Sequence, residues 1–314
     1  MYNGCIDNQT PEQKAKNYQF NELVASANPV IWEERDWKRY KLRTQDGSGS
    51  CVAMSIATAV GIKFQQKYNE WKDFSSAFTY RRRGGDYSGM TTTDVLNIVP
   101  KKGNVFEEFL QGQNMSDEQI AKLKEPAYLE DLAKAFKMNV VFLPLDFETV
   151  ASTIQTTGHA IVWFKFANAD WTDFPFDSGK PITSGHSVCA VDAVLYKGKK
   201  YIVIQDSWGK TYGLKGYRLI SEEYFNARCF NAFYLFNFKV VSEAVEKPKF
   251  DGSVKSLQDC LKYEGLFPAN IDSTGIFGNV TKTALIAFQK RYNITPALGV
   301  FGDITKAKLL EVYP

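Results

Sequence analysis

Three reactive side chains in a fixed order place the strongest constraint on how this chain can fold. A glycine- and serine-rich stretch, Gln45-Asp46-Gly47-Ser48-Gly49-Ser50, leads to Cys51, and an apolar run begins directly after it. Far downstream stand Gly185-His186-Ser187 and then Gln205-Asp206-Ser207-Trp208-Gly209. A cysteine, a histidine and an orienting carboxylate act together only when the fold brings them into contact. The fold must therefore bring Cys51 and His186, which are 135 positions apart in the sequence, into contact.

The residues around Cys51 predict an activated thiol. The thiolate is the nucleophilic form of cysteine, and a helix N-terminus and a protonated imidazole both favour it. The apolar residues between Val52 and Val60 indicate a buried helix that begins at Cys51. We expect His186 to be the ion-pair partner and later the general acid, with Asp206 holding its second ring nitrogen. We expect Gln45 to donate its side-chain amide to the oxyanion.

Composition narrows the class of protein. With 314 residues, 44% of them hydrophobic, the chain is long enough for two domains with cores of their own. A net charge of +3 gives no reason to expect a nucleic-acid partner. The five cysteines are scattered and odd in number, so we expect no disulfide framework, no metal site and no cofactor. The N-terminus has no secretory signal pattern, and no apolar run approaches the roughly 20 residues of a membrane span.

The pattern along the chain predicts an α+β fold with two lobes. The first half favours helices, at residues 65–77 and 117–137. The second half favours short strands, at residues 139–143, 160–164, 188–196 and 201–204. A helical lobe that carries Cys51, packed on a β lobe that carries His186 and Asp206, suits an enzyme with a cleft between its lobes.

These motifs resemble those of the papain-like cysteine peptidases. That family has Gln, then Cys-Gly-Ser-Cys before an aromatic residue, then His-Ala-Val and Asn-Ser-Trp-Gly, and its spacing of about 130–150 residues is similar to that found here. Residues 84–90, a glycine-rich stretch, stand where the family has a wall of its substrate cleft. The resemblance covers residues 28–240. It implies hydrolysis of peptide bonds through a thioester at Cys51, with substrate contacts from Gly84, Gly85, Gly89, Met90 and Trp208.

The chain also departs from the family pattern. Asp206 replaces the usual Asn, and a carboxylate holds an imidazolium more strongly than an amide does. Val52 replaces the usual aromatic residue, and Ser48 stands where the family often has a disulfide cysteine. Residues 1–27 form a polar lead-in that looks too short for the family's long inhibitory pro-segment. The second histidine, His159, precedes an apolar run and is expected to be a core or edge residue.

A second module follows a linker predicted at residues 241–252. Gly275-Ile276-Phe277-Gly278-Asn279 recurs as Gly299-Val300-Phe301-Gly302-Asp303, each before a helical pattern, and we expect Asn279 and Asp303 to be N-caps. Together with Ala287-Phe288-Gln289, the repeat resembles the small three-helix peptidoglycan-binding domain. The resemblance covers residues 253–314 and implies bacterial peptidoglycan as a partner.

The two resemblances together predict a cysteine-type peptidase that cuts protein or peptide substrates and is targeted to the bacterial cell wall. One alternative is an endolysin-like hydrolase, of bacterial or phage origin, that cuts peptidoglycan crosslinks. A second alternative is a wall-binding protein without catalytic activity. The sequence leaves the compartment open; we expect action at the cell wall or outside the cell.

Overall fold

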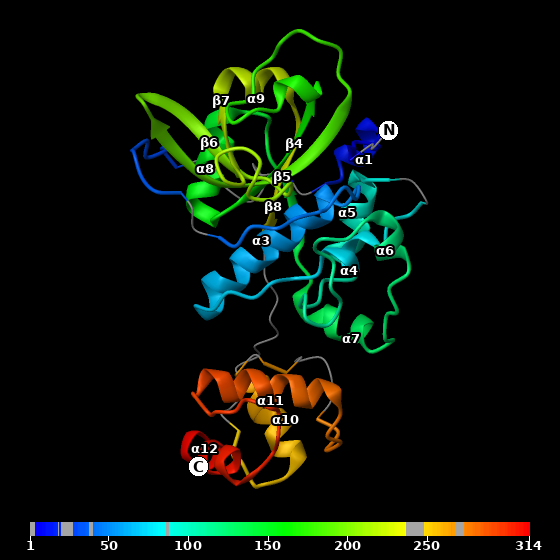
Figure 1. The fold of residues 1–314 in the computed structure, drawn as a ribbon, viewed down its shortest axis with the longest axis vertical. Coiled ribbons are helices and arrows are strands. Elements are labelled where there is room, and N and C mark those ends of the chain that lie inside the picture. The colour runs from blue at the N-terminus through cyan, green and yellow to red at the C-terminus, as the bar shows by residue number, and fades with distance from the viewer. Residues whose placement is uncertain are drawn as a thin grey trace. The chain divides into compact units, whose positions relative to one another are not determined.

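The computed structural model describes residues 4–17, 19, 28–37, 40–85, 88–236, 248–264, 266–267 and 273–314. The chain divides into two compact units. The larger unit consists of Met1–Leu129 and Phe136–Phe238, and the smaller one of Glu130–Ala135 and Lys239–Pro314 (Figure 1).

A six-stranded antiparallel sheet forms the β part of the larger unit. In spatial order its strands are β3 (Asn139–Phe142), β8 (Cys229–Phe236), β4 (Ala160–Phe166), β5 (Ser184–Tyr196), β6 (Lys199–Gln205) and β7 (Tyr217–Ser221). The four runs that the sequence predicts as strands lie in β3, β4, β5 and β6, whereas β7 and β8 are additional. In the register of β4 and β5, Phe164 lies opposite His186, which places this histidine on an interior strand of the sheet.

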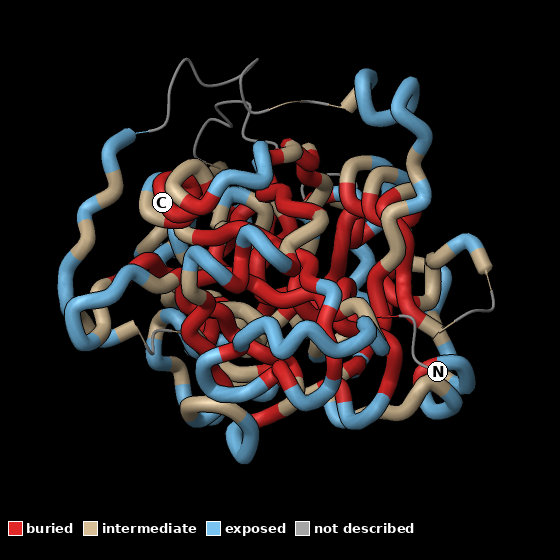
Figure 2. The backbone as a smooth tube through the Cα atoms, turned by 90° about the horizontal axis from the view of Figure 1, so that it is seen from above, coloured by how far each residue is buried: buried red, intermediate tan, exposed pale blue. Residues whose placement is uncertain are grey.

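One hydrophobic core lies between this sheet and two helices, α8 (Phe147–Thr157) and α9 (Glu222–Arg228). Alternate residues of β4 point into this core, among them Val162, Phe164 and Phe166. Figure 2 shows the buried positions gathered in the interior of the fold and the exposed positions on its outer turns.

The long helix α3 (Cys51–Tyr68) contacts β4, β5 and β8. All its residues from Cys51 to Ile62 are buried. A helix that is hydrophobic on every side is stable only inside a core, so this helix forms the centre of the unit. Asn69, in the left-handed conformation with φ 53°, ends α3 and donates its N–H to the carbonyl of Gln65.

The shorter helices of the first half are α4 (Ser76–Tyr80), α5 (Thr92–Ile98), α6 (Asp117–Ala121) and α7 (Leu129–Ala133), followed by the 3₁₀ helix η1 (Lys134–Phe136). The helix predicted at 65–77 is therefore wrong at residues 69–75, which separate α3 from α4. The helix predicted at 117–137 is interrupted, because α6 ends at Ala121 and α7 begins at Leu129. Pro126 lies in the gap between them and disfavours the helical conformation of the residue before it.

The N-terminal lead-in contains β1 (Cys5–Ile6) and α1 (Pro11–Lys14). β1 pairs in parallel with β2 (Met90–Thr91), so that Cys5 lies opposite Met90. The N–H of Met90 donates to the carbonyl of Gly4 at 3.0 Å. Much of the rest of the predicted lead-in lies outside the described residues.

The smaller unit contains the helices α10 (Val254–Tyr263), α11 (Asn279–Arg291) and α12 (Asp303–Val312). Phe250 packs in its core and donates its N–H to the carbonyl of Tyr313 at 3.0 Å. Phe250 therefore belongs to the module rather than to the predicted linker, of which residues 241–247 lie outside the described residues. The N-caps of α11 and α12 are Gly278 and Gly302, one residue earlier than predicted.

Each copy of the repeated loop is clamped by a buried glutamine from the helix before it. Gln258 Nε2 donates to the carbonyl of Ile276 at 3.0 Å and to the hydroxyl of Thr281 at 2.9 Å, while its Oε1 accepts from the N–H of Gly275 at 2.9 Å. Gln289 makes the same three bonds with Val300, Thr305 and Gly299, at 2.9, 2.9 and 2.8 Å. The sequence repeat is thus a structural repeat.

Within the described residues, no helix combines the length and the apolar character needed to cross a lipid bilayer.

Candidate active site

The predicted nucleophile lies in the first turn of a buried helix. Cys51 is the first residue of α3, and Ser50 before it has the non-helical angles φ −84° and ψ 13°. The first N–H groups of a helix have no partner within the helix, so they present a positive end to a neighbouring anion. Cys51 itself is 2% exposed.

His186 and Asp206 come together from the sheet. His186 lies near the start of β5, and Asp206 directly follows β6. His186 Nε2 and Asp206 Oδ1 are 2.8 Å apart, and both residues are buried. The remaining ring nitrogen, Nδ1, is left for Cys51, whose thiol helps to raise the pKa of the imidazole. The structure thus brings the three side chains that the sequence singles out into one line of contacts.

The charged forms of His186 and Asp206 stabilise each other. Burial alone would lower the pKa of His186, but the Asp206 carboxylate and the Cys51 thiol outweigh it and raise that pKa to about 9. Burial alone would raise the pKa of Asp206, but His186 and Arg218 outweigh it and hold that pKa at about 2. An imidazolium and a carboxylate therefore face each other across the neutral range.

Asp206 has two further partners that the sequence analysis missed. Its Oδ2 accepts from the indole N–H of Trp171 at 2.9 Å and from Nε of Arg218 at 2.7 Å. Trp171 follows the 3₁₀ helix η2 (Asn168–Asp170), and Arg218 lies in β7. No local pattern marks either residue, because each becomes a partner of Asp206 only when the strands pair.

Gln45 is held in one orientation. Its Nε2 donates to the carbonyl of Ser48 at 2.6 Å, and its Oε1 accepts from the hydroxyl of Ser207 at 2.5 Å. The backbone N–H of Gln45 also donates to the carbonyl of Ser207 at 2.8 Å. Since a primary amide has two N–H groups, one remains for a ligand.

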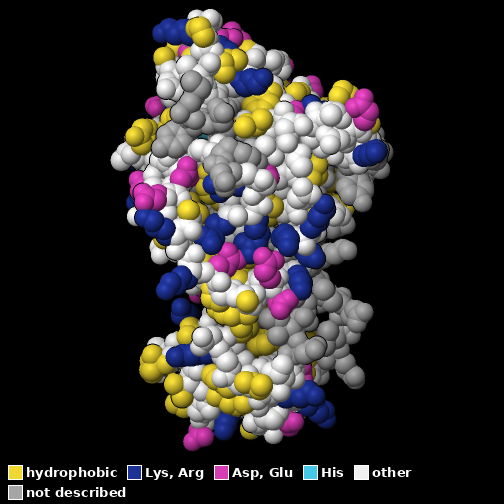
Figure 3. All heavy atoms as spheres, turned by 90° about the vertical axis from the view of Figure 1, so that its right-hand side faces the viewer, with side chains coloured by type: hydrophobic (Ala, Val, Ile, Leu, Met, Phe, Trp, Pro, Cys, Tyr) yellow, Lys and Arg dark blue, Asp and Glu magenta, His cyan; other side chains and the backbone are white. Residues whose placement is uncertain are grey.

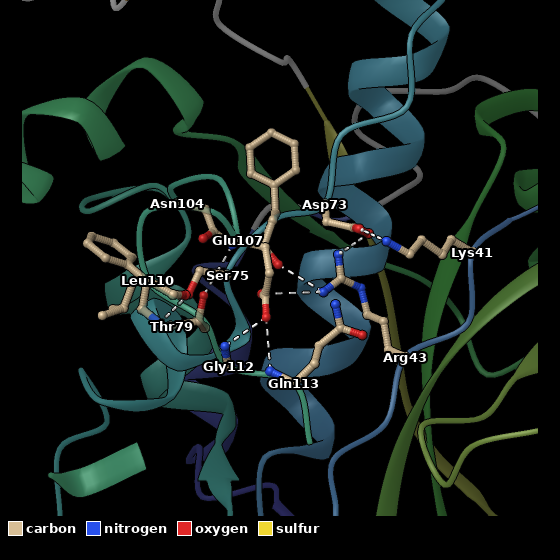
Figure 4. Close-up of polar contacts among 12 residues, drawn as sticks. Lys41, Arg43, Asp73, Ser75, Thr79, Asn104, Glu107, Leu110, Gly112 and Gln113 are labelled. Atoms are coloured by element: carbon tan, nitrogen blue, oxygen red, sulfur yellow. Dashed lines mark hydrogen bonds and ion pairs between the residues drawn. The ribbon is translucent and has the colours of Figure 1, made fainter. Parts of the chain in front are cut away.

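The segment before Gln45 is anchored by a buried arginine. Arg43 Nη1 donates to the carbonyl of Phe74 at 2.9 Å and lies 3.9 Å from Glu107 Oε2, and Nη2 lies 3.5 Å from Asp73 Oδ1. Figure 4 shows the guanidinium of Arg43 between these two carboxylates, with Lys41 on the far side of Asp73. This network ties the chain that leads to the nucleophile onto the helical lobe.

Trp208 covers the imidazole. Its ring lies 5.2 Å from that of His186, and Tyr212 packs edge-on against it at 5.8 Å. Trp208 therefore shields the contact between His186 and Asp206 from water. Its predicted contact with substrate stays a prediction.

The N-terminal lead-in passes directly over the nucleophile. We call residues 4–8 the strap. A Cβ atom added at Gly4 would collide with the carbonyl oxygen of Gly185 and lie 3.0 Å from Cys51 Sγ, so only glycine fits at this position. A Cβ added at Gly185 would lie 2.8 Å from the carbonyl oxygen of Cys5. The lead-in was expected to be too short for an inhibitory segment, yet a few of its residues reach the thiol.

The strap is held by the predicted cleft wall. Met90 is buried and pairs with Cys5, and Gly89 before it has φ 104° and donates its N–H to the hydroxyl of Tyr80 at 3.1 Å. Two further residues that were predicted to bind substrate are Gly84 and Gly85. Gly84 is exposed, and its N–H donates to Asp94 Oδ1 at 2.7 Å. Residues 86 and 87 of the wall lie outside the described residues, and substrate binding by the wall stays a prediction.

The remaining candidates have structural roles. His159 is fully buried, accepts from the N–H of Leu235 at 3.1 Å through Nε2, and has a pKa lowered to about 3 by burial and by Lys63. It is therefore a neutral core residue.

All five cysteines are free. Within the described residues, no group of three or more His, Cys, Asp or Glu side chains lies close enough to hold a metal ion.

Residues 251–309 match the family described as "Putative peptidoglycan binding domain". No curated protein matches the chain in sequence. Among solved structures, xylellain, a cysteine protease from Xylella fastidiosa, is 17% identical, with a TM-score of 0.61 over 75% of this chain and 96% of its own. Procathepsin B S9 from Trypanosoma congolense is 13% identical, with a TM-score of 0.56 over 74% of this chain and 87% of its own. Digestive procathepsin L 3 from the larval midgut of Tenebrio molitor is 15% identical, with a TM-score of 0.52 over 71% and 76%.

These similarities show that the larger unit has the papain-like fold, with a peptidoglycan-binding-like domain after it. The predicted α+β class is confirmed.

Proposed function

We propose that the chain is a papain-like cysteine peptidase that hydrolyses peptide bonds through a thioester on Cys51, and that its C-terminal module holds it at bacterial peptidoglycan. The observation that carries the proposal is the line of contacts from Asp206 through His186 to Cys51 at the start of α3. A thiol at a helix N-terminus beside a charged imidazole is an activated nucleophile.

In this mechanism the thiolate of Cys51 attacks the carbonyl carbon of the substrate, and the carbonyl oxygen becomes an oxyanion. The oxyanion accepts from the N–H groups at the start of α3 and from the remaining N–H of Gln45. His186 then gives its proton to the leaving amine, the C–N bond breaks, and the thioester remains. A water molecule, deprotonated by the neutral imidazole, hydrolyses the thioester and restores Cys51.

The strap supports the same proposal from another direction. A peptide segment already lies against the thiol and pairs its backbone with Met90, as an extended peptide pairs with a strand edge. The surface beside Cys51 therefore accepts polypeptide. In this state the strap covers the nucleophile, so the enzyme is expected to be latent until the strap moves.

The C-terminal module is proposed to supply location rather than chemistry. It exposes apolar side chains from both copies of its repeat, including Ile276, Val300 and Ile304, which are 72%, 61% and 72% exposed. Figure 3 shows hydrophobic side chains on the surface of this unit. Binding to the wall would raise the concentration of the enzyme near wall-bound substrates without changing its chemistry.

The match at residues 251–309 also favours a second function, in which the enzyme cuts the peptide crosslinks of peptidoglycan itself. Both reactions break amide bonds by the same steps, so the substrate alone separates them. The purified chain should be incubated with casein and, separately, with isolated peptidoglycan, and new amino termini should be counted. Cys51→Ala is the matched control.

New termini in casein alone would support the peptidase. Termini in peptidoglycan alone would support the crosslink hydrolase. If neither substrate is cut, even after the strap has been removed, the chain is a wall-binding protein without catalytic activity.

A further inference from the structure

Arg218 is a buried cation whose contacts converge on the residues behind His186. It is 2% exposed. Its Nε donates to Asp206 Oδ2 at 2.7 Å, and its Nη1 donates to the backbone carbonyls of Trp171 and Thr172 at 2.8 and 2.7 Å. The guanidinium carbon also lies 5.3 Å from the ring of Trp171 and 5.4 Å from the ring of Trp208, which is cation–π distance.

A buried carboxylate needs such a partner. Removing one charge from water costs several kcal/mol in a protein interior unless an opposite charge and hydrogen bonds compensate for it. Asp206 obtains both, because three donors, from His186, Trp171 and Arg218, reach its two oxygens. A neutral Asn at this position would need no cation beside it. Asp206 and Arg218 therefore compensate each other's buried charge.

We propose that Arg218 is a positioning residue that acts through Asp206: it fixes the direction of the carboxylate and limits how strongly that carboxylate holds the proton on His186. This inference rests on the proposed peptidase function. Without Arg218, the full negative charge of Asp206 would act on the imidazole. Without Asp206, the positive charge of Arg218 would repel the imidazolium.

Among the described residues, the charged or titratable groups that act on His186 are Cys51 from α3 and Asp206 after β6, and Arg218 from β7 lies behind Asp206. Cys5 of β1 lies against the neighbouring Gly185, and burial together with Cys51 raises the pKa of Cys5. The other contacts are the rings of Phe166, Trp171 and Trp208.

The test compares Arg218→Met, Arg218→Lys, Asp206→Asn and the double variant Asp206→Asn/Arg218→Met with the wild type. Two readouts are measured against pH: the alkylation rate of Cys51 with iodoacetamide, followed by peptide mapping, and kcat/KM on a small peptide. Because the strap covers Cys51 in every variant, each profile is compared with that of the wild type, both in its position on the pH axis and in its maximum.

In Arg218→Met, the alkaline limb of kcat/KM should move to higher pH, by about one unit for the loss of one nearby charge. The alkaline inflection of the alkylation profile, where His186 loses its proton while the thiolate remains, should move with it, and kcat/KM at its maximum should fall at least tenfold. Arg218→Lys retains the charge, so its limb should stay near that of the wild type while kcat/KM falls. Among the variants, Asp206→Asn should have its alkaline limb at the lowest pH. The double variant, which also lacks the positive charge of Arg218, should have its limb at a higher pH than Asp206→Asn.

Wild-type limbs in a folded Arg218→Met protein, together with equal limbs in Asp206→Asn and the double variant, would overturn the proposal. If Arg218→Met does not fold, the comparison of the last two variants decides, since neither contains an unpaired buried carboxylate. A protein that hydrolyses nothing even after the strap has been removed would refute the proposed function, whereas the alkylation profiles would still report whether Arg218 acts on His186.

Discussion

The hydroxyl of Ser207 donates to the side-chain oxygen of Gln45 across 2.5 Å. Because Gln45 Nε2 also donates to the carbonyl of Ser48, the amide is fixed from both ends. Ser207 directly follows Asp206 in the chain. One short stretch after β6 therefore positions both the acceptor behind His186 and the proposed oxyanion donor.

Replacing Gln45 should affect the transition state more than substrate binding. Gln45→Glu removes the N–H donor and should lower kcat about 100-fold to 1,000-fold, the usual loss for one oxyanion-hole donor, with KM little changed. Ser207→Ala, which leaves the donor in place but less well oriented, should cost less. Steady-state kinetics on a small peptide measure both. Gln111→Glu, at an exposed glutamine of the same unit, is the control; an effect confined to KM would show that Gln45 only binds substrate.

The pH dependence follows from His186. Its pKa is raised to about 9, against burial, by Asp206 and Cys51. The imidazolium is therefore present below that pH and is lost as the pH rises through it. We expect kcat/KM to be retained through neutral pH and to fall along a limb centred near pH 9. A limb near the ordinary histidine pKa of about 6.5 would mean that the contact with Asp206 does not persist in solution.

A methyl group at Gly4 should activate the enzyme. In Gly4→Ala the new Cβ would collide with the carbonyl of Gly185, so the strap can no longer lie over Cys51. We expect kcat/KM on a small peptide to rise at least tenfold while the thermal unfolding midpoint falls only slightly, because only the pairing of the strap with β2 and the burial of Cys5 are lost. Gly278→Ala is the matched control, because a Cβ there meets no atom within 4 Å. Unchanged kcat/KM in Gly4→Ala would show that the strap does not limit access.

Alkylation should distinguish Cys51 from the other cysteines. Burial raises the pKa of Cys189, and burial is also the main cause that raises the pKa values of Cys229 and Cys260 to about 12. Iodoacetamide near pH 6 should therefore label Cys51 first, and faster in Gly4→Ala than in the wild type. Peptide mapping after short exposure gives the order. Equal labelling of all cysteines at this pH would contradict an ion-paired thiolate.

The glutamine clamps predict where the smaller unit is vulnerable. Gln289→Leu removes three hydrogen bonds and leaves the N–H of Gly299 without its acceptor. This change should destabilise the unit by about 2–4 kcal/mol and reduce co-sedimentation of the full chain with peptidoglycan. Hydrolysis of a small soluble peptide should stay at the wild-type rate. Lys290→Ala, at the exposed neighbouring residue, is the control. An equal loss of co-sedimentation in both variants would show that the hydrogen bonds of Gln289 are not the cause.

The sequence predicts the parts of the fold whose pattern is local. The apolar run after Cys51 gives α3, and four β-favouring runs give β3, β4, β5 and β6. Helix lengths in the first half are predicted less well. The helices are interrupted at Asn69 and in the stretch that contains Pro126, where composition alone would extend them.

The site shows the same division. The order of Cys51, His186 and Asp206, with their flanking residues, is enough to predict the line of contacts. Arg218 is not predictable in this way, because it meets Asp206 only after β6 and β7 pair. The strap could not be predicted for a related reason, since a short polar segment carries no sign of the residues against which it lies.

Gly4 contributes no side chain to either core, so replacing it would cost the fold little beyond the pairing of the strap with β2, and its main effect would be on which molecules can reach the thiol. A screen for misfolded variants would pass over such a change. If the proposed function holds, a cell that made the variant would contain a peptidase whose nucleophile the strap no longer covers. Selection at this position would then act through damage to other proteins, and not through the fate of the enzyme itself.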